Sequence, residues 1–374
     1  MKKIKKKNKL KVGIIGGGIN STIGRAHLSA LRMDGCYEIT SGFFSRNKET
    51  NNKTLNSLNL TSINYNNDFK EYVINESNKI DVFLILSNTF GHLDHIKYLS
   101  DFKKPIICEK PTSINIDELK HVTNIFNNKN INYFPIYNYT GYPIIRDIKN
   151  FIKKNLLGYI HSIELKMPQQ SLTKKKIGNT KKWRLEDLTV PTIQLDLGVH
   201  LLSLLKFIFP NIKINKVISY EQIFKNKNLV HTVNSWIELN SGAICKIFIT
   251  KNDIGERNNL SIKINGTNGS LKWQHADPEN LILYNETGKK VILDRNDNEL
   301  TISKEKRYNR YSVGHPYGFI ESLANYYYDI YLYLSNKDKK SKKYLISLED
   351  ENFIMQIIKK LHESYVKKKW INIK

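Results

Sequence analysis

The segment LKVGIIGGGINSTIG, residues 10–24, decides the fold of this chain. Leu10 to Gly16 is an apolar run of strand length, two further glycines follow it, and residues 22–32 then show helical spacing. A strand, a glycine-rich turn and a helix form the context in which a dinucleotide binds, because glycines let the backbone approach a pyrophosphate at a helix N-terminus. The segment predicts such a site, and a glycine-rich turn without a nucleotide is the alternative interpretation.

The spacing of the glycines departs from the common dinucleotide pattern. A G-x-G-x-x-G motif has its third glycine where this chain has Ser21, and the next glycine is Gly24. The predicted cofactor contacts in this loop are Gly16, Gly18, Ile19, Asn20 and Ile23.

The residues after the second predicted strand, 37–44, bear on the choice of cofactor. An NAD-preferring fold usually places an acidic residue there to bind the ribose hydroxyls. This chain has Ser45 and Arg46 instead, and a hydroxyl beside a guanidinium can bind a 2′-phosphate. The pair favours NADP slightly over NAD, and an exposed arginine in a turn is the alternative.

Strands alternate with helices through the first part of the chain. Further strands are predicted at 80–86, 106–108 and 131–137, and helices at 91–100 and 114–127. This alternation predicts an α/β, doubly wound parallel sheet, a Rossmann domain, over residues 1–135, with a basic tail at 1–9.

The pattern changes beyond that point, and residues 136–374 are predicted to form an α+β domain with an open, mainly antiparallel sheet. Its strand-like runs, several of them separated by Asn, Gly and Asp turns, are 160–167, 213–220, 230–239, 243–250, 260–264, 269–273, 281–284 and 290–293. Helices are predicted at 325–334 and 349–365, and the second of these is expected to close the chain and pack on the first domain.

A charged pair followed by proline stands at the end of the predicted strand 106–108. Proline cannot extend a central strand, so Glu109 and Lys110 lie at its carboxyl end. Ligands bind at this edge of an open parallel sheet, which makes Lys110 a candidate functional residue. A solvated turn is the alternative interpretation.

A second candidate group lies in the predicted helix 192–209. Asp196, His200, Ser203 and Lys206 form one polar stripe on an otherwise apolar helix. A histidine in such a stripe can act as a base near neutral pH. The alternative is a structural pair, in which Asp196 satisfies a core histidine.

Bulk properties argue against two classes of partner and against a metal site. The net charge of +24 would suit nucleic acid, but the lysines are spread along the chain rather than clustered in a stripe. No apolar run approaches the roughly 20 residues of a membrane helix. Cys36, Cys108 and Cys245 are far apart and lack disulfide or metal spacing, so a reducing, cytoplasmic setting and no metal are expected.

Together these motifs resemble the Gfo/Idh/MocA oxidoreductase family over nearly the whole chain. Glu109-Lys110-Pro111 is similar to the hallmark of the family, and Asp196-x-x-x-His200 to its downstream aspartate and histidine. One branch shares the GGGxxxxIGxxH loop, residues 16–27, and the segment NYTGYP, residues 138–143. Residues 191–195 depart from the family pattern, which usually has glycines before the aspartate.

The resemblance implies a nicotinamide cofactor held also by Ser87, Asn88, His92, Glu109 and Lys110. It implies that Lys110 lies near the nicotinamide and the reacting carbon, and that the Lys110–Pro111 bond is cis. It also implies that His200 exchanges the substrate hydroxyl proton and that Asp196 holds its ring or the substrate. The implied substrate contacts are Asn138, Tyr139, Tyr142, Trp183, Arg184 and His315.

The function implied by the resemblance is NAD(P)-dependent hydride transfer with a sugar, nucleotide-sugar or cyclitol secondary alcohol or ketone. A homo-oligomer, dimer or tetramer, formed through the open sheet is also implied. A cofactor-binding protein of the same fold without turnover, acting as a regulator or subunit, is the alternative. The enzyme hypothesis requires Lys110 and His200, from the two predicted domains, to act on one substrate.

Overall fold

The structure is a computed structural model that describes residues 9–60, 68–173, 182–224 and 228–373. The chain forms two compact units, residues 1–141 with 319–352, and residues 142–318 with 353–374. Each unit therefore contains two separate stretches of chain, whereas the sequence suggested one boundary near residue 135. Of the predicted basic tail at 1–9, residues 1–8 lie outside the described part of the chain.

The described residues of the first unit contain a five-stranded sheet in the order β2-β1-β3-β4-β5, and every pairing in it is parallel. The chain passes from β1 to β2 on one side and then to β3 on the other side of β1, so the strand order reverses between β1 and β3, as in a doubly wound fold. The predicted fold class is confirmed. The strands are β1 (Leu10–Gly16), β2 (Tyr37–Phe43), β3 (Val82–Leu86), β4 (Ile106–Glu109) and β5 (Tyr133–Ile136).

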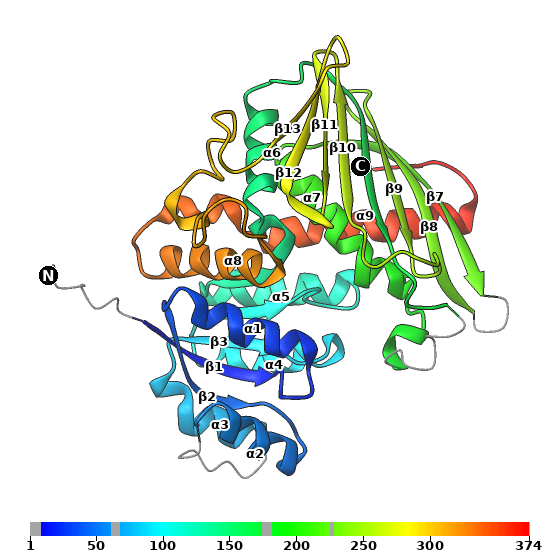
Figure 1. The fold of residues 1–374 in the computed structure, drawn as a ribbon. Helices are drawn as coiled ribbons and strands as arrows, with labels where there is room; N and C mark the ends of the chain where they lie inside the picture. The colour runs from blue at the N-terminus through cyan, green and yellow to red at the C-terminus, as the bar shows by residue number, and fades with distance from the viewer. Residues whose placement is uncertain (1–8, 61–67, 174–181, 225–227, 374) are drawn as a thin grey trace, which may run out of the picture. The chain divides into compact units, whose positions relative to one another are not determined.

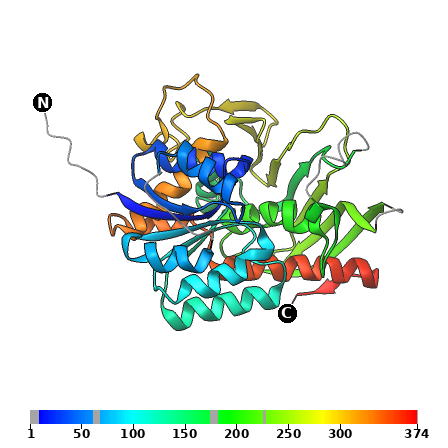
Figure 2. The ribbon, with the colours of Figure 1, turned by 90° about the horizontal axis from the view of Figure 1, so that it is seen from below.

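Helices cover both faces of this sheet. α1 packs with α8, and α4 packs with α5 on the opposite face (Figure 2). The opposite placement follows from right-handed crossovers, because β1 to β2 and β3 to β4 run in opposite directions across the sheet. The helices are α1 (Thr22–Met33), α2 (Lys48–Ser57), α3 (Phe69–Glu76), α4 (His92–Ser100), α5 (Ile116–Lys129) and α8 (Phe319–Leu334).

The described residues of the second unit contain a nine-stranded sheet in the order β13-β12-β11-β10-β6-β9-β8-β7-β14 (Figure 1). β6 and β9 pair in parallel, and the other neighbours are antiparallel, as predicted. The strands are β6 (Ile160–Pro168), β7 (Ile214–Phe224), β8 (Leu229–Leu239), β9 (Ile244–Thr250), β10 (Ser261–Gly266), β11 (Gly269–Gln274), β12 (Asp277–Asn285), β13 (Lys290–Leu293) and β14 (Ile371–Asn372).

One face of this sheet carries α6 (Pro143–Lys153), α7 (Val199–Ile208) and the second part of α9 (Leu348–Lys367). α9 begins in the first unit and ends in the second. Its His362 lies 3.0 Å from Glu221 of β7, which attaches the end of the helix to the sheet. Among the described residues, no helix is both long and apolar enough to cross a membrane.

The predicted helix 192–209 is helical over residues 192–208, but it is interrupted by a π-helical turn. Residues Gln194–Gly198 form a π-helical turn, and α7 follows it. The backbone N–H of Val199 donates to the carbonyl of Gln194, five residues earlier, instead of four. Asp196 lies in the π-helical turn and His200 in α7, so the regular spacing assumed for their stripe does not hold.

Candidate cofactor and catalytic sites

The glycine turn after β1 leaves no room for side chains. Gly16 has a φ of +82°, and a Cβ there would lie 2.5 Å from the backbone nitrogen of Ser87. A Cβ on Gly24, the displaced third glycine, would lie 2.1 Å from the carbonyl oxygen of Gly17. The turn therefore packs directly on α1 and on the end of β3, the close approach that a pyrophosphate site requires.

The first turn of α1 offers an anion-binding end. The Ser21 side chain caps the helix by accepting from the Gly24 N–H at 3.1 Å, and the first turn carries no acidic residue. The Ile19 N–H already donates to Thr54 Oγ1 at 3.0 Å, so any contact from Ile19 would come from its exposed side chain. The Asn20 and Ile23 side chains are also exposed. The cradle fits a dinucleotide phosphate at a helix N-terminus.

Ser45 and Arg46 lie just after β2, as the sequence suggested. Ser45 is half-buried, whereas Arg46 is exposed. The Ser45 hydroxyl accepts from the Asn47 N–H at 3.1 Å. Burial lowers the pKa of His95 to about 4, and the charge of Arg46 contributes to that shift. Arg46 is thus an accessible cation whose field reaches a neutral imidazole on α4.

The loop after β3 is organised by histidines. Ser87 Oγ is hydrogen-bonded to His95 Nδ1 at 3.0 Å, and the Asn88 side chain caps the following turn by accepting from Gly91 N–H at 3.1 Å. The buried ring of His92 places Nδ1 3.0 Å from the Pro111 carbonyl and Nε2 3.1 Å from the Ser87 carbonyl. His92 therefore connects the ends of β3 and β4. Sequence reasoning did not find His95.

Lys110 lies at the carboxyl end of β4, and the Lys110–Pro111 bond is cis, as the resemblance implied. Glu109 Oε2 accepts from the Lys110 backbone N–H at 3.1 Å. Glu109 Oε1 lies 2.8 Å from His27 Nε2. Glu109 therefore has hydrogen-bond partners on both carboxylate oxygens.

A buried acid that the sequence did not reveal lies behind this turn. Glu351, at the start of α9, accepts from the Thr112 backbone N–H at 3.4 Å, from the Thr112 hydroxyl, and from the Tyr137 hydroxyl at 2.8 Å. Burial raises the pKa of Glu351 to about 7. No local motif marks this glutamate, because it lies 239 positions along the chain from Thr112.

Asn138 and Tyr139 lie in the short helix Asn138–Gly141 of the first unit, and both are buried. Within the part of the chain that the structure describes, the Asn138 side-chain nitrogen has no hydrogen-bond partner. A buried amide nitrogen of this kind is suited to donate to a ligand oxygen.

In the second unit, Asp196 lies between two cations. Arg184 donates to it from Nε at 3.1 Å and from a terminal nitrogen at 3.3 Å. Lys251, which directly follows β9, lies 2.7 Å from Oδ2, and its side chain is only 2% exposed. Sequence reasoning missed Lys251, because one lysine does not stand out among 59 Lys and Arg.

The neighbours of Asp196 include other predicted site residues. The Arg184 guanidinium lies over the Trp183 ring, 4.6 Å from its centroid, an arrangement typical of a cation–π contact. His200 is buried, and the Ser203 hydroxyl donates to its carbonyl at 2.8 Å. The second unit thus holds Asp196, Arg184 and Trp183 together, while Lys110 belongs to the first unit.

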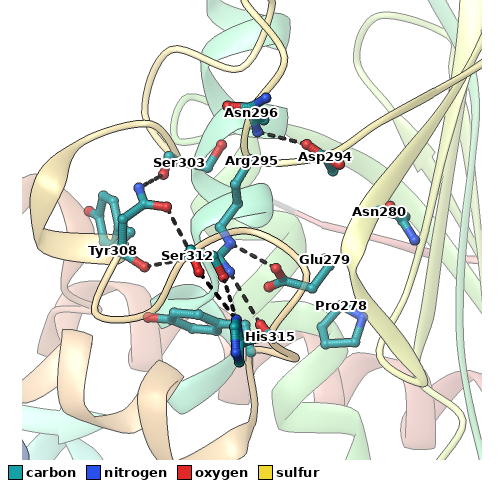
Figure 3. A network of polar contacts seen from close by, with 12 residues as sticks. Pro278, Glu279, Asn280, Asp294, Arg295, Asn296, Ser303, Tyr308, Ser312 and His315 are labelled. Carbon is teal, nitrogen blue, oxygen red and sulfur yellow. Dashed lines mark hydrogen bonds and ion pairs between the residues drawn. The ribbon is translucent and has the colours of Figure 1, made fainter.

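Two further predicted substrate residues differ in exposure. Tyr142 is buried, and its hydroxyl is hydrogen-bonded to His275 Nε2 at 3.0 Å, which is an interior packing position. His315 is exposed, on a loop whose backbone is hydrogen-bonded to Arg295 (Figure 3). Arg295 donates to Glu279 at 2.7 Å and to the His315 carbonyl at 3.4 Å.

The sequence was compared with protein families and with curated proteins. A model described as "Oxidoreductase family, NAD-binding Rossmann fold" matches residues 10–137, and one described as "Oxidoreductase family, C-terminal alpha/beta domain" matches residues 149–373. Glucose-6-phosphate 3-dehydrogenase of Bacillus subtilis (strain 168) is 23% identical over 283 residues, which is 72% of this chain and 75% of that protein.

Solved structures share the fold at low sequence identity. An inositol dehydrogenase homolog from Azotobacter vinelandii, solved with NADH and myo-inositol, has a TM-score of 0.89 at 20% identity and covers 98% of both chains. Levoglucosan dehydrogenase in complex with NADH has a TM-score of 0.81 at 18% identity, over 98% of this chain and 99% of that one. At these identities the likeness establishes the fold.

Proposed function

Because this chain belongs to the Gfo/Idh/MocA oxidoreductase family, we propose that it transfers a hydride between a nicotinamide cofactor and a secondary alcohol or ketone of a sugar, nucleotide-sugar or cyclitol. The names of its relatives support this substrate class, since they include dehydrogenases of glucose 6-phosphate and levoglucosan and a homolog of inositol dehydrogenase. One observation carries the proposal: Lys110 directly follows β4 at the same sheet edge at which the glycine turn follows β1.

The residues proposed to hold the cofactor follow that edge of the first unit. The glycine turn and the α1 N-terminus would hold the pyrophosphate. Ser45 and Arg46 would contact the adenosine ribose, and the 87–92 loop would contact the nicotinamide half of the cofactor. When bound, the cofactor supplies or accepts the hydride. Arg46, an accessible cation just after β2, supports a slight preference for NADP over NAD.

We assign the proton chemistry to three side chains. His200 takes the hydroxyl proton, because an imidazole needs little tuning to act as a base near neutral pH. Lys110 supplies the positive charge that stabilises the developing alkoxide. Asp196 is held by Arg184 and Lys251, and we propose that this ion-paired carboxylate fixes the substrate or the histidine.

Polar and aromatic side chains in each unit are proposed to bind the substrate ring. In the first unit these are Asn138, with its buried amide nitrogen, and Tyr139. In the second unit Trp183 offers an aromatic face, Arg184 hydrogen-bond donors and His315 an exposed ring. We also propose that the chain assembles as a homo-oligomer through the uncovered face of its second sheet.

Replacing Lys110 by Ala tests the function. We expect turnover to fall by about 10²-fold or more while cofactor binding stays near normal, because the lost ammonium acts on the reacting oxygen rather than on the phosphates. Steady-state kinetics on a panel of sugars, nucleotide-sugars and cyclitols, with cofactor fluorescence titration, measures both quantities.

Lys120→Ala is the matched control for this experiment, because it removes an exposed lysine of α5 and should change neither quantity. Unchanged turnover in Lys110→Ala would remove this lysine from the mechanism. Cofactor binding by the wild type without turnover of any compound in the panel would favour the non-catalytic alternative.

A further inference from the structure

His27 belongs to the GGGxxxxIGxxH loop motif, but none of the roles assigned above uses it. The residue lies on α1 and is fully buried. Its Nε2 lies 2.8 Å from Glu109 Oε1, and its Nδ1 lies 2.6 Å from the hydroxyl of Tyr327 on α8. A buried imidazole with partners on both nitrogens has a fixed orientation.

The chemistry of the partners gives these hydrogen bonds one direction. An ionised Glu109 is only an acceptor, so Nε2 must carry the proton that is donated to Oε1. If the ring is neutral, Nδ1 is then an acceptor, and the Tyr327 hydroxyl donates a hydrogen bond to it. The second oxygen, Oε2, accepts from the Lys110 backbone N–H at 3.1 Å. Tyr327, His27, Glu109 and the Lys110 amide therefore form one continuous chain of hydrogen bonds.

The turn around Lys110 has two further buried attachments. The His92 ring contacts the Pro111 carbonyl, and Glu351 accepts from Thr112. These two side chains hold the residues that follow Lys110, whereas His27 holds the carboxylate that precedes it. Loss of His27 should therefore leave the turn folded and change mainly the orientation of Glu109.

We propose that His27 is a positioning residue for Lys110, and that it couples the helix beginning at the cofactor turn to the catalytic lysine through Glu109. The proposal rests on the function assigned to Lys110 above. His27 lies two helical turns or less from the N-terminus of α1, so a shift of that helix moves the imidazole and the carboxylate with it.

A double-mutant cycle separates positioning from a general structural role. We expect His27→Leu to lower kcat by about 10-fold or more with a small change in KM, and His27→Gln to recover most of the loss, because a Gln side-chain amide can still donate to Glu109. In a Lys110→Ala background His27→Leu should lower kcat less than twofold. Equal factors in both backgrounds would overturn the proposal.

Tyr72→Phe is the matched buried control in the same unit, since it removes a hydroxyl that is hydrogen-bonded to Ser41 of β2. This variant should lower stability without changing the kinetics. If His27→Leu does not fold, Tyr327→Phe replaces it in the cycle, because this variant removes the hydroxyl that is hydrogen-bonded to Nδ1.

A second readout does not depend on turnover. The rate at which an acetylating reagent labels Lys110, measured by peptide mass spectrometry, should change at least threefold in His27→Leu, while labelling of Lys120 stays constant. Unchanged labelling together with unchanged kcat would refute the inference. A wild type without turnover would refute the proposed function, and the labelling experiment would still decide whether His27 positions Lys110.

Discussion

At the scale of single residues, two buried acids are held in different ways. In the first unit Glu351 is held by neutral donors, a threonine and a tyrosine. In the second unit Asp196 is held by two full positive charges. Neutral donors compensate the charge of a buried carboxylate less than cations do, and burial raises the pKa of Glu351.

Arg46→Ala tests the cofactor preference at this scale. We expect the variant to weaken NADPH binding by about 10-fold or more and NADH binding much less, because the guanidinium would contact only the 2′-phosphate. Fluorescence titration with both cofactors measures the two losses, and Lys48→Ala removes a neighbouring exposed charge as the control. Equal weakening of both cofactors would count against the 2′-phosphate role.

Glu351 makes the stability of the folded chain depend on pH. Burial raises its pKa from 4.5 to about 7. At pH values between these two, the folded chain therefore keeps a proton that the unfolded chain has already released. The contribution to stability is therefore greatest below pH 4.5 and decreases as the pH rises to about 7, by on the order of 3 kcal/mol.

Urea unfolding at a series of pH values between 4.5 and 8 measures this effect. The free energy of unfolding of the wild type should decrease relative to that of Glu351→Gln across this range, since glutamine does not titrate. Asp117→Asn, at an exposed position of α5, is the control and should follow the wild-type curve. Parallel curves for wild type and Glu351→Gln would contradict the role of this carboxyl.

At the scale of elements, the contact between α1 and the glycine turn is the tightest feature of the cofactor site. Gly24 lies on the helix and Gly17 in the turn, and the helix backbone lies directly against the turn carbonyl. In the second unit, the π-helical turn Gln194–Gly198 has a similar role. It contains Asp196 and precedes α7, so it sets the direction in which the Asp196 side chain points.

Gly24→Ala should separate the helix from the turn. The added Cβ would lie 2.1 Å from the Gly17 carbonyl oxygen, so the backbone must move. We expect a loss of about 1–3 kcal/mol in the free energy of unfolding and weaker binding of both cofactors. Ser29→Ala, at an exposed position of the same helix, should change neither denaturation nor cofactor titration. Wild-type cofactor affinity in Gly24→Ala would mean that the turn does not hold the phosphates.

At the scale of the whole molecule, one face of the second sheet carries exposed aromatic rings. Tyr220 of β7 pairs with Asn234, two residues before Trp236 on β8, so Tyr220 and Trp236 point to the same side. They are 59% and 41% exposed. Large exposed aromatic rings on a sheet face are typical of an interaction surface.

Trp236→Lys should disrupt assembly if this face forms the proposed homo-oligomer. We expect the mass measured by light scattering after gel filtration to fall to that of one chain, because a charge would be buried without a partner. Ile254→Lys is the control, since Ile254 is 87% exposed on a loop. The same oligomeric mass for Trp236→Lys and the wild type would exclude this face as the interface.

The sequence alone determined the fold class and the positions of most strands. β1 has the predicted bounds, α1 and β4 end within a residue of theirs, and the sheet of the second unit is mainly antiparallel as expected. Strands and helices follow from local apolar periodicity and from glycine and proline positions, which a single sequence displays directly. The motif Glu109-Lys110-Pro111 could be found for the same reason.

Only the tertiary structure determined which side chains surround the candidate sites. His27 reaches Glu109 across 82 positions, and Glu351 reaches Thr112 across 239. The assignment of α8 to the first unit, the π-helical turn and the ion pair of Lys251 with Asp196 were likewise not visible in local patterns. Each depends on packing between segments far apart in the chain, and no local periodicity encodes such contacts.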